Sequence, residues 1–178
     1  NGGWLSGNFA WEHEKYLSSG TAEQVKAMVE AFHGTVDEVI AAAEMEGINA
    51  DIHRTQELAI ATNAYQFQRL APELKRLHHW GDHRSRLESE AQLRARIAIP
   101  SARGALVTSG VARIQPAKFV RGLADAVERL GVTIYEATRA DEISKGQVIT
   151  DQGRIACGVV LKATEGYSAR LSGYERDW

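Results

Sequence analysis

The stretch from residue 104 to residue 143 constrains the fold most, because its pattern is that of a strand, a helix and a second strand in succession. Residues 104–114 carry β-favouring apolar side chains. Pro116 follows at a first helical position, where its missing N–H costs nothing, and apolar residues then repeat at helical spacing up to Leu130. Gly131 ends the helix, and residues 132–135 form a buried-strand run. We predict one crossover unit, an arrangement that places ligands at the carboxyl ends of parallel strands.

The rest of the chain adds further helices and strands around this unit. A helix is predicted from Thr21 to Glu46, since Thr21 and Gln24 form a capping box and Gly47 follows its last turn. Residues 48–62 are predicted to be extended, followed by a helix over 64–80 that Pro72 interrupts or restarts. A short helix is capped by Ser89. After residue 143 we predict a hairpin turning at 151–153 and a strand at 159–161. The fold class is therefore α/β, or mixed α+β.

Composition and charge exclude several classes of protein. The 178 residues suffice for one domain or two small ones, and the net charge of −2 with a pI of about 6.3 argues against a nucleic-acid partner. No apolar run reaches the roughly 20 residues of a transmembrane helix. The single cysteine and the lack of a signal peptide favour a cytoplasmic location. The chain opens on Asn1 without an initiator methionine, so we expect an internal piece of a longer protein.

Few residues indicate a catalytic or metal-binding role on their own. His78, His79 and His83 surround Asp82, but the first two would point to different helix faces, and a solvent-exposed polar turn is favoured over a metal site. His13, His33 and His53 are scattered and carry no motif. No nucleophile elbow, phosphate-binding lysine loop or Gly-x-Gly-x-x-Gly turn occurs.

Two segments have the composition of ligand-binding loops. The first twenty residues mix glycines with aromatic side chains, for which a loop with a small apolar cluster is the favoured alternative. Residues 163–166 form a small-residue loop straight after an apolar run, where an ordinary turn and a cofactor loop are equally supported.

An ordered set of short motifs resembles one enzyme family. The motifs are Asn1-Gly2-Gly3, Gly104-Ala105-Leu106, Ala112 to Lys118, Val120 to Leu123, Gly131 to Glu136 and Ala163 to Tyr167. In this order and spacing the chain resembles the FAD-dependent oxidoreductases of the D-amino acid oxidase and glycine oxidase family, and most of all its gamma-glutamylputrescine oxidase branch. The resemblance implies part of a glutathione-reductase-type FAD-binding domain, residues 1–47 and 115–178, and part of a mixed-sheet substrate domain, residues 48–114.

The same resemblance implies where FAD would be held. The expected cofactor-binding residues are Asn1, Gly2 and Gly3 beside the flavin, Ala140 near the adenine, and Ala163, Thr164 and Gly166 near the dinucleotide. Arg113 could meet a substrate carboxylate, because arginine matches that geometry bidentately, although packing or a surface ion pair is favoured for it. No catalytic acid or base and no metal ligand is assigned.

The implied reaction is oxidation of the C–N bond of a small amine or amino acid by hydride transfer to FAD. Because the dinucleotide-binding turn is missing, we expect this chain by itself to be inactive and not to hold FAD stably. The alternative is a non-catalytic α/β module that binds a partner or forms a homo-oligomer through exposed apolar surface.

Overall fold

A computed structural model describes residues 3–9 and 12–174 of the chain, which divides into two compact units. The first unit extends to Leu130 and the second begins at Gly131. Both combine strands with helices, so the predicted mixed α/β class is confirmed. No helix among the described residues is long and apolar enough to cross a membrane.

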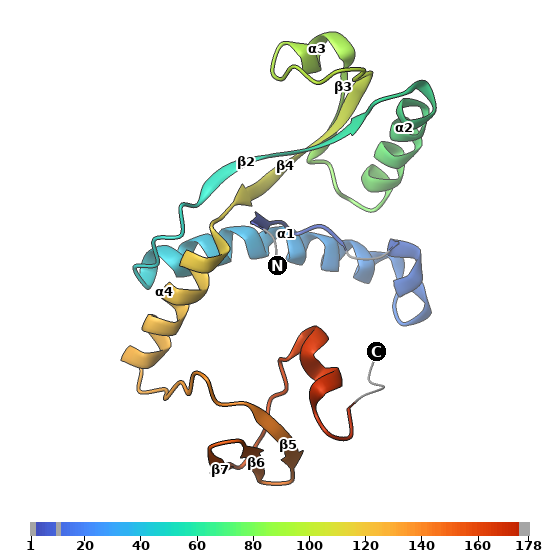
Figure 1. Ribbon diagram of the computed structural model, residues 1–178. Helices are drawn as coiled ribbons and strands as arrows, with labels where there is room; N and C mark the ends of the chain where they lie inside the picture. Colours follow the sequence, from blue (N-terminus) through green and yellow to red (C-terminus); the bar gives the residue numbers. More distant parts are fainter. Residues whose placement is uncertain (1–2, 10–11, 175–178) are drawn as a thin grey trace. The chain divides into compact units, whose positions relative to one another are not determined.

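The first unit is built around the long strand β4. In chain order its elements are β1 (Trp4–Leu5), the 3-10 helix η1 (His13–Ser18), α1 (Ala22–Met45), β2 (His53–Ala61), α2 (Ala64–His79), β3 (Ser85–Ser89), α3 (Glu90–Arg94), β4 (Gly104–Arg113) and α4 (Pro116–Arg129) (Figure 1). β2 pairs antiparallel along one edge of β4, while β3 and β1 share the opposite edge. β3 and β1 were not predicted from the sequence, because β3 contains one apolar residue, Leu87, and β1 has two residues in all.

A bulge in β4 separates the half that pairs with β3 from the half that pairs with β1. Glu57 lies opposite Thr108, yet Thr55 lies opposite Val111, so β4 carries one more residue than β2 over this interval. Gly110 lies in the bulge with φ +75°, a conformation that glycine adopts without strain. The bulge bends the strand, so that its two halves face different helices.

The helix ends follow the capping signals of the sequence. Thr21 and Ser89 each make the predicted capping box, at the start of α1 and α3 respectively. The side chain of Asn63 accepts a hydrogen bond from the backbone N–H of Gln66 at 2.9 Å and caps α2. Pro72, however, neither interrupts nor restarts α2, which continues through it to His79. Pro116 occupies the first turn of α4, as predicted.

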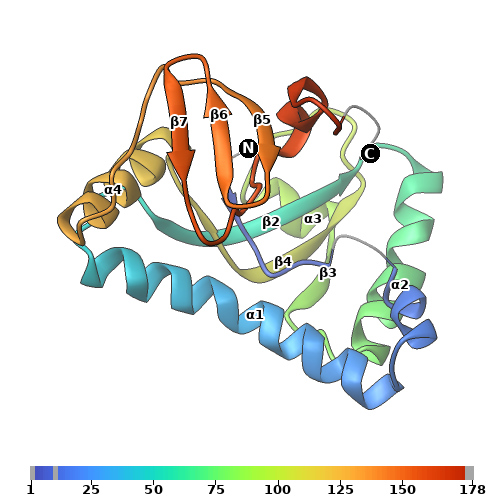
Figure 2. The same ribbon diagram turned by 90° about the horizontal axis from the view of Figure 1, so that it is seen from below.

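The core of the first unit consists of three small apolar clusters along the sheet. Residues from β4 and α3, including Val107 and Leu93, form the first cluster. α1 crosses the sheet at the other end of β4, where Val36 and Ile40 pack on Ala112 (Figure 2). The third cluster joins the end of α1 to the segment before β2 and to α4. Burial of these side chains holds the helices on the sheet.

The second unit is a small antiparallel sheet followed by a helical turn. Its elements are β5 (Ala140–Ser144), β6 (Gln147–Thr150), β7 (Gly153–Ala156) and the 3-10 helix η2 (Glu165–Arg170). The strands follow the order β5-β6-β7, and the predicted hairpin between β6 and β7 is confirmed.

Two predicted strands are absent, and with them the parallel crossover. Residues 132–135 and 159–161 have no strand assignment, and every ladder among the described residues is antiparallel. Their apolar side chains are open to solvent, with 52% of Val132 and 89% of Leu161 exposed. An extended segment becomes a strand only when a neighbour pairs its backbone groups, and the described residues offer neither segment such a neighbour.

Candidate functional site

The N-terminal glycine loop is tied to the connection between β4 and α4. The predicted residues Asn1 and Gly2 lie outside the described residues. The carbonyl oxygen of Gly3 accepts a hydrogen bond from the backbone N–H of Ile114 at 2.8 Å. A Cβ atom at Gly3 would lie 2.6 Å from the carbonyl oxygen of Ile114, too close for any side chain. Glycine is therefore required here by the close approach of two backbone segments.

The other predicted cofactor residues lie in the second unit. Ala140 begins β5, and Thr164 precedes η2, where its hydroxyl lies 2.8 Å from the hydroxyl of Ser168. The backbone N–H of Ser172, just after η2, donates to the carbonyl of Asp141 at 3.3 Å, which ties the loop segment to β5. Ala163 and Gly166 are small and exposed. Ala140 and Thr164 are half-buried, so Ala163 and Gly166 are the more accessible of these predicted positions.

Arg113, the predicted carboxylate ligand, ends β4 between Trp4 and His53. Its exposed side chain lines a cavity of about 360 Å³ on the sheet. Among the described residues no carboxylate lies within ion-pair distance of Arg113. Of the two favoured alternatives for Arg113, packing or a surface ion pair, the described residues therefore do not form the ion pair.

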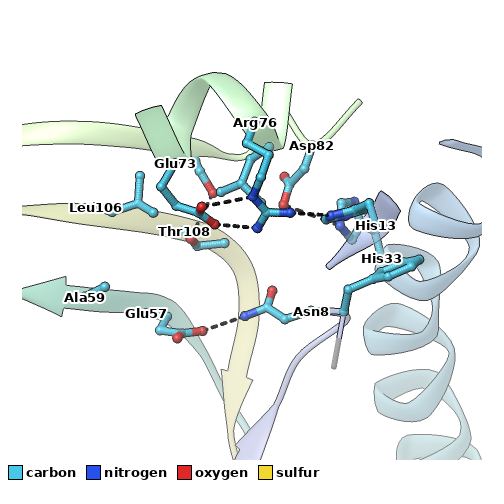
Figure 3. Close-up of a pocket in the computed structure, with 13 residues that line it drawn as sticks. Asn8, His13, His33, Glu57, Ala59, Glu73, Arg76, Asp82, Leu106 and Thr108 are labelled. Carbon is cyan, nitrogen blue, oxygen red and sulfur yellow. Dashed lines mark hydrogen bonds and ion pairs between the residues drawn. The ribbon is translucent and has the colours of Figure 1, made fainter. Parts of the chain in front are cut away.

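A second cavity, which the sequence did not predict, is lined mainly by polar side chains (Figure 3). It has a volume of about 210 Å³ and lies between the N-terminal loop, α1, α2 and the sheet. The lining residues are Asn8, Phe9, His13, His33, Glu57, Ala59, Glu73, Arg76, Leu77, Asp82, Ser85, Leu106 and Thr108.

His13 is the most constrained side chain of this polar cavity. It is 4% exposed, and its ring stacks on Phe9 at 4.6 Å and on Trp80 at 5.7 Å between ring centroids. Its Nδ1 lies 2.9 Å from Nη1 of Arg76. Because a guanidinium can only donate, Nδ1 accepts, and the neutral ring carries its proton on Nε2. Burial, and after it the charge of Arg76, lowers the pKa of His13.

Arg76 is held in place by a carboxylate of its own helix. Glu73 accepts from Nη2 of Arg76 at 2.6 Å and from Nε at 3.0 Å, a bidentate pair that raises the pKa of Arg76. Beside this pair, the indole N–H of Trp80 donates to Glu14 at 3.0 Å and lowers the pKa of that carboxyl. The positive charge of Arg76 is thus already balanced inside the protein.

Asp82 lies at the bottom of the polar cavity, 5% exposed. Its carboxylate is 3.6 Å from Nε2 of His33 and 3.5 Å from Nε of Arg84, and it accepts the backbone N–H of Arg84 at 3.1 Å. Burial is the main cause that lowers the pKa of His33, with Arg84 adding to it and Asp82 opposing it. The predicted solvent-exposed polar turn is confirmed for His78, His79 and His83, which are exposed, but it is wrong at Asp82, which is buried.

This cavity was missed because its side chains come from distant parts of the chain. His13 and His33 carry no motif, and only the folding of η1 and α1 against α2 brings them near Asp82. Among residues 3–9 and 12–174, no group of three or more histidine, cysteine, aspartate or glutamate side chains could hold a metal ion.

Solved structures of amino acid oxidising enzymes share this fold. Glycine oxidase from Geobacillus kaustophilus superposes with a TM-score of 0.74 at 19% identity over 97% of this chain and 46% of that chain. Glycine oxidase from Bacillus cereus superposes with a TM-score of 0.73 at 21% identity, over 99% of this chain and 47% of that chain. L-proline dehydrogenase from P. horikoshii superposes with a TM-score of 0.69 at 15% identity, over 84% of this chain and 41% of that chain. The chain thus spans less than half the length of these enzymes.

Sequence comparison identifies the family more directly than the fold does. None of the curated proteins matches the chain at the sequence level. The family DAO, described as FAD dependent oxidoreductase, matches residues 1–176, which is nearly the whole chain. Over those residues the chain belongs to the DAO family of FAD-dependent oxidoreductases.

Proposed function

We propose that this chain forms part of a flavin-dependent oxidoreductase that oxidises the C–N bond of a small amine or amino acid. The family match over residues 1–176 carries the proposal. Residues 1–47 and 115–178 are assigned to the FAD-binding domain, and residues 48–114 to the substrate domain. Within the family we favour the gamma-glutamylputrescine oxidase branch, on the motifs between residues 104 and 167, and a cytoplasmic location.

The residues of this chain would bind and orient rather than react. FAD would supply the hydride acceptor for oxidation of the carbon that bears the nitrogen, and water would hydrolyse the oxidised product. Gly3 lets the loop beside the flavin lie flat on Ile114, because it has no side chain. Ala140, Ala163, Thr164 and Gly166 would offer the dinucleotide their backbone groups.

Arg113 is proposed to bind the carboxylate of a substrate that has one. Its guanidinium has no ion-pair partner among the described residues and lines the cavity that also contains Trp4. A guanidinium binds a carboxylate through two parallel hydrogen bonds. The variant Arg113→Gln should therefore raise KM for amino acids and leave KM for amines without a carboxylate unchanged. Equal effects on both classes of substrate would argue against this role.

The proposal is tested on the purified protein that contains this chain. We expect stoichiometric flavin absorbance, and bleaching of that absorbance when an amine or amino acid is added without oxygen. Bound flavin that no amine or amino acid reduces would refute the reaction, and absence of flavin would refute cofactor binding.

A second candidate function is a non-catalytic module that associates through exposed apolar surface. The observation behind it is the apolar surface of α4, where Val120, Leu123 and the following Leu130 are exposed. Light scattering after size exclusion tests it on the chain itself. A monomer at high protein concentration would count against association.

A further inference from the structure

The polar cavity of the first unit is open at one end and closed by buried polar groups at the other. Asn8 and Ala59 are exposed and Glu57 is half-buried, so these residues form the mouth. His13, Asp82, Ser85 and Thr108 are buried and form the bottom. Figure 3 shows Glu57 and Asn8 on the side of the cavity opposite the Glu73–Arg76 pair. A small molecule can therefore enter past Glu57.

The charges of the cavity do not balance. Glu73 is neutralised by Arg76 and Asp82 by Arg84. Glu57 instead accepts one neutral hydrogen bond, from the amide of Asn8 at 2.8 Å. Among the residues the structure describes, no lysine, arginine or histidine lies within 4.0 Å of the Glu57 carboxylate. One uncompensated negative charge thus remains at the mouth, where it attracts cations.

The walls of the cavity suit an organic cation. Phe9 is one of the lining residues, and an aromatic side chain is compatible with an ammonium group nearby. The hydroxyls of Ser85 and Thr108, 2.9 Å apart, supply oxygen acceptors at the bottom. His13 and His33 stay neutral at neutral pH, because burial lowers the pKa of each, so neither repels a cation.

A metal ion fits this cavity less well than an ammonium group. Calcium takes six to eight oxygen ligands, whereas two of the three carboxylates here are already paired with arginines. An ammonium group has three donors and needs one counter-ion with a few acceptors. Glu57 and Thr108 lie directly opposite each other on β2 and β4, so the carboxylate and the Thr108 hydroxyl, with Ser85 beside it, meet that need together.

We propose that this cavity binds a primary ammonium group, with the Glu57 carboxylate as its counter-ion and the Phe9 ring as part of its wall. This site includes none of the residues proposed to hold FAD, so it does not rest on the flavin reaction. The ammonium group can belong to the oxidised substrate or to a separate small amine, and both would be recognised by the same chemistry.

The probe for the experiment is propylammonium, with propanol as a neutral molecule of similar size. The full protein that contains this chain is labelled with ¹⁵N-histidine, and the ring signals of His13 and His33 are followed during titration. We expect saturable shifts with propylammonium and none with propanol. Glu57→Gln keeps the shape and an acceptor for Asn8 but removes the charge, and should weaken binding about tenfold or more, as for loss of a charge-assisted hydrogen bond.

The matched control is Glu38→Gln, the same change at an exposed residue of α1 that does not line the cavity. It should bind propylammonium as the unchanged protein does. Equal shifts with propanol, or unchanged affinity in Glu57→Gln, would overturn the proposal.

Steady-state kinetics then separates the two sources of the ammonium group. If Glu57→Gln raises KM of the oxidised amine about tenfold with kcat unchanged, the substrate occupies the cavity. If KM is unchanged while propylammonium binding is lost, the ligand is a separate amine. Both results support the site. A protein without oxidase activity that still binds propylammonium refutes only the proposed function.

Discussion

Replacing Gly7 by alanine tests how the N-terminal loop is held against α1. A Cβ atom at this position would collide with the carbonyl oxygen of Phe32, and would lie 2.6 Å from its carbonyl carbon and 2.8 Å from Cα of His33. These distances are well inside the 3.4 Å at which ordinary contacts begin. The obstacles are backbone atoms of a helix and cannot rotate away, so the loop itself must move.

The expected cost follows from overpacking a site that cannot relax locally. Insertion of a methyl group into close-packed surroundings costs about 1–3 kcal/mol, and we expect Gly7→Ala to lie at the upper end of that range. The displaced loop carries Asn8 and Phe9, so the 2.8 Å bond to Glu57 and the 4.6 Å stack on His13 should weaken as well.

The matched control is Gly34→Ala, in α1 directly after His33, the residue that the loop approaches. Nothing lies within 4 Å of a Cβ at Gly34, which sits inside α1. Alanine should therefore stabilise the helix by about 0.5–1 kcal/mol. The same glycine-to-alanine change is thus predicted to lower stability in the loop and to raise it in the helix that the loop contacts.

Urea unfolding of the protein that contains this chain measures both changes, since four tryptophans report by fluorescence. The midpoint should fall for Gly7→Ala and rise for Gly34→Ala. A Gly7→Ala midpoint equal to or above that of the unchanged protein would refute the close approach of the loop to α1.

Three further predictions concern the same unit. The pKa values of His13 and His33 are lowered in the folded protein, so as pH falls the unfolded chain takes up protons before the folded protein does. The stability that these two residues contribute is therefore retained above pH 6.5 and is lost as pH falls from 6.5 through their folded-state pKa values. A midpoint of thermal unfolding that stays constant over that range would contradict this prediction. Leu93→Ala should cost about 2–5 kcal/mol in urea unfolding, because Leu93 is fully buried between α3 and β4; a loss below about 1 kcal/mol would show that this cluster is not packed. Ser89→Ala should cost about 1 kcal/mol through loss of the α3 capping box, whereas Ser89→Asn should keep most of that stability.

Local sequence determined the helices and their ends. The capping boxes at Thr21 and Ser89 and the cap at Asn63 depend only on residues three positions apart, and each appears where it was predicted. The hairpin between β6 and β7 likewise depends on a short turn. Such features need no distant partner, so the amino-acid pattern is sufficient to predict them.

Strand formation and the polar cavity were decided by tertiary structure instead. Residues 132–135 have the composition of a strand, but none of the described residues pairs with them, while residues 85–89 form β3 because β4 lies beside them. Asp82 looked like part of an exposed turn until α1 placed His33 over it.

By itself, the sequence determined the family, through ordered motifs over nearly the whole chain, and the positions of the helices. Only the tertiary structure decided that Glu73 and Asp82 are paired with arginines, and that Glu57 lines the polar cavity with no cationic side chain within 4.0 Å among the described residues. The reason is physical: a motif is read along the chain, whereas charge balance depends on which side chains folding brings within about 4 Å of one another.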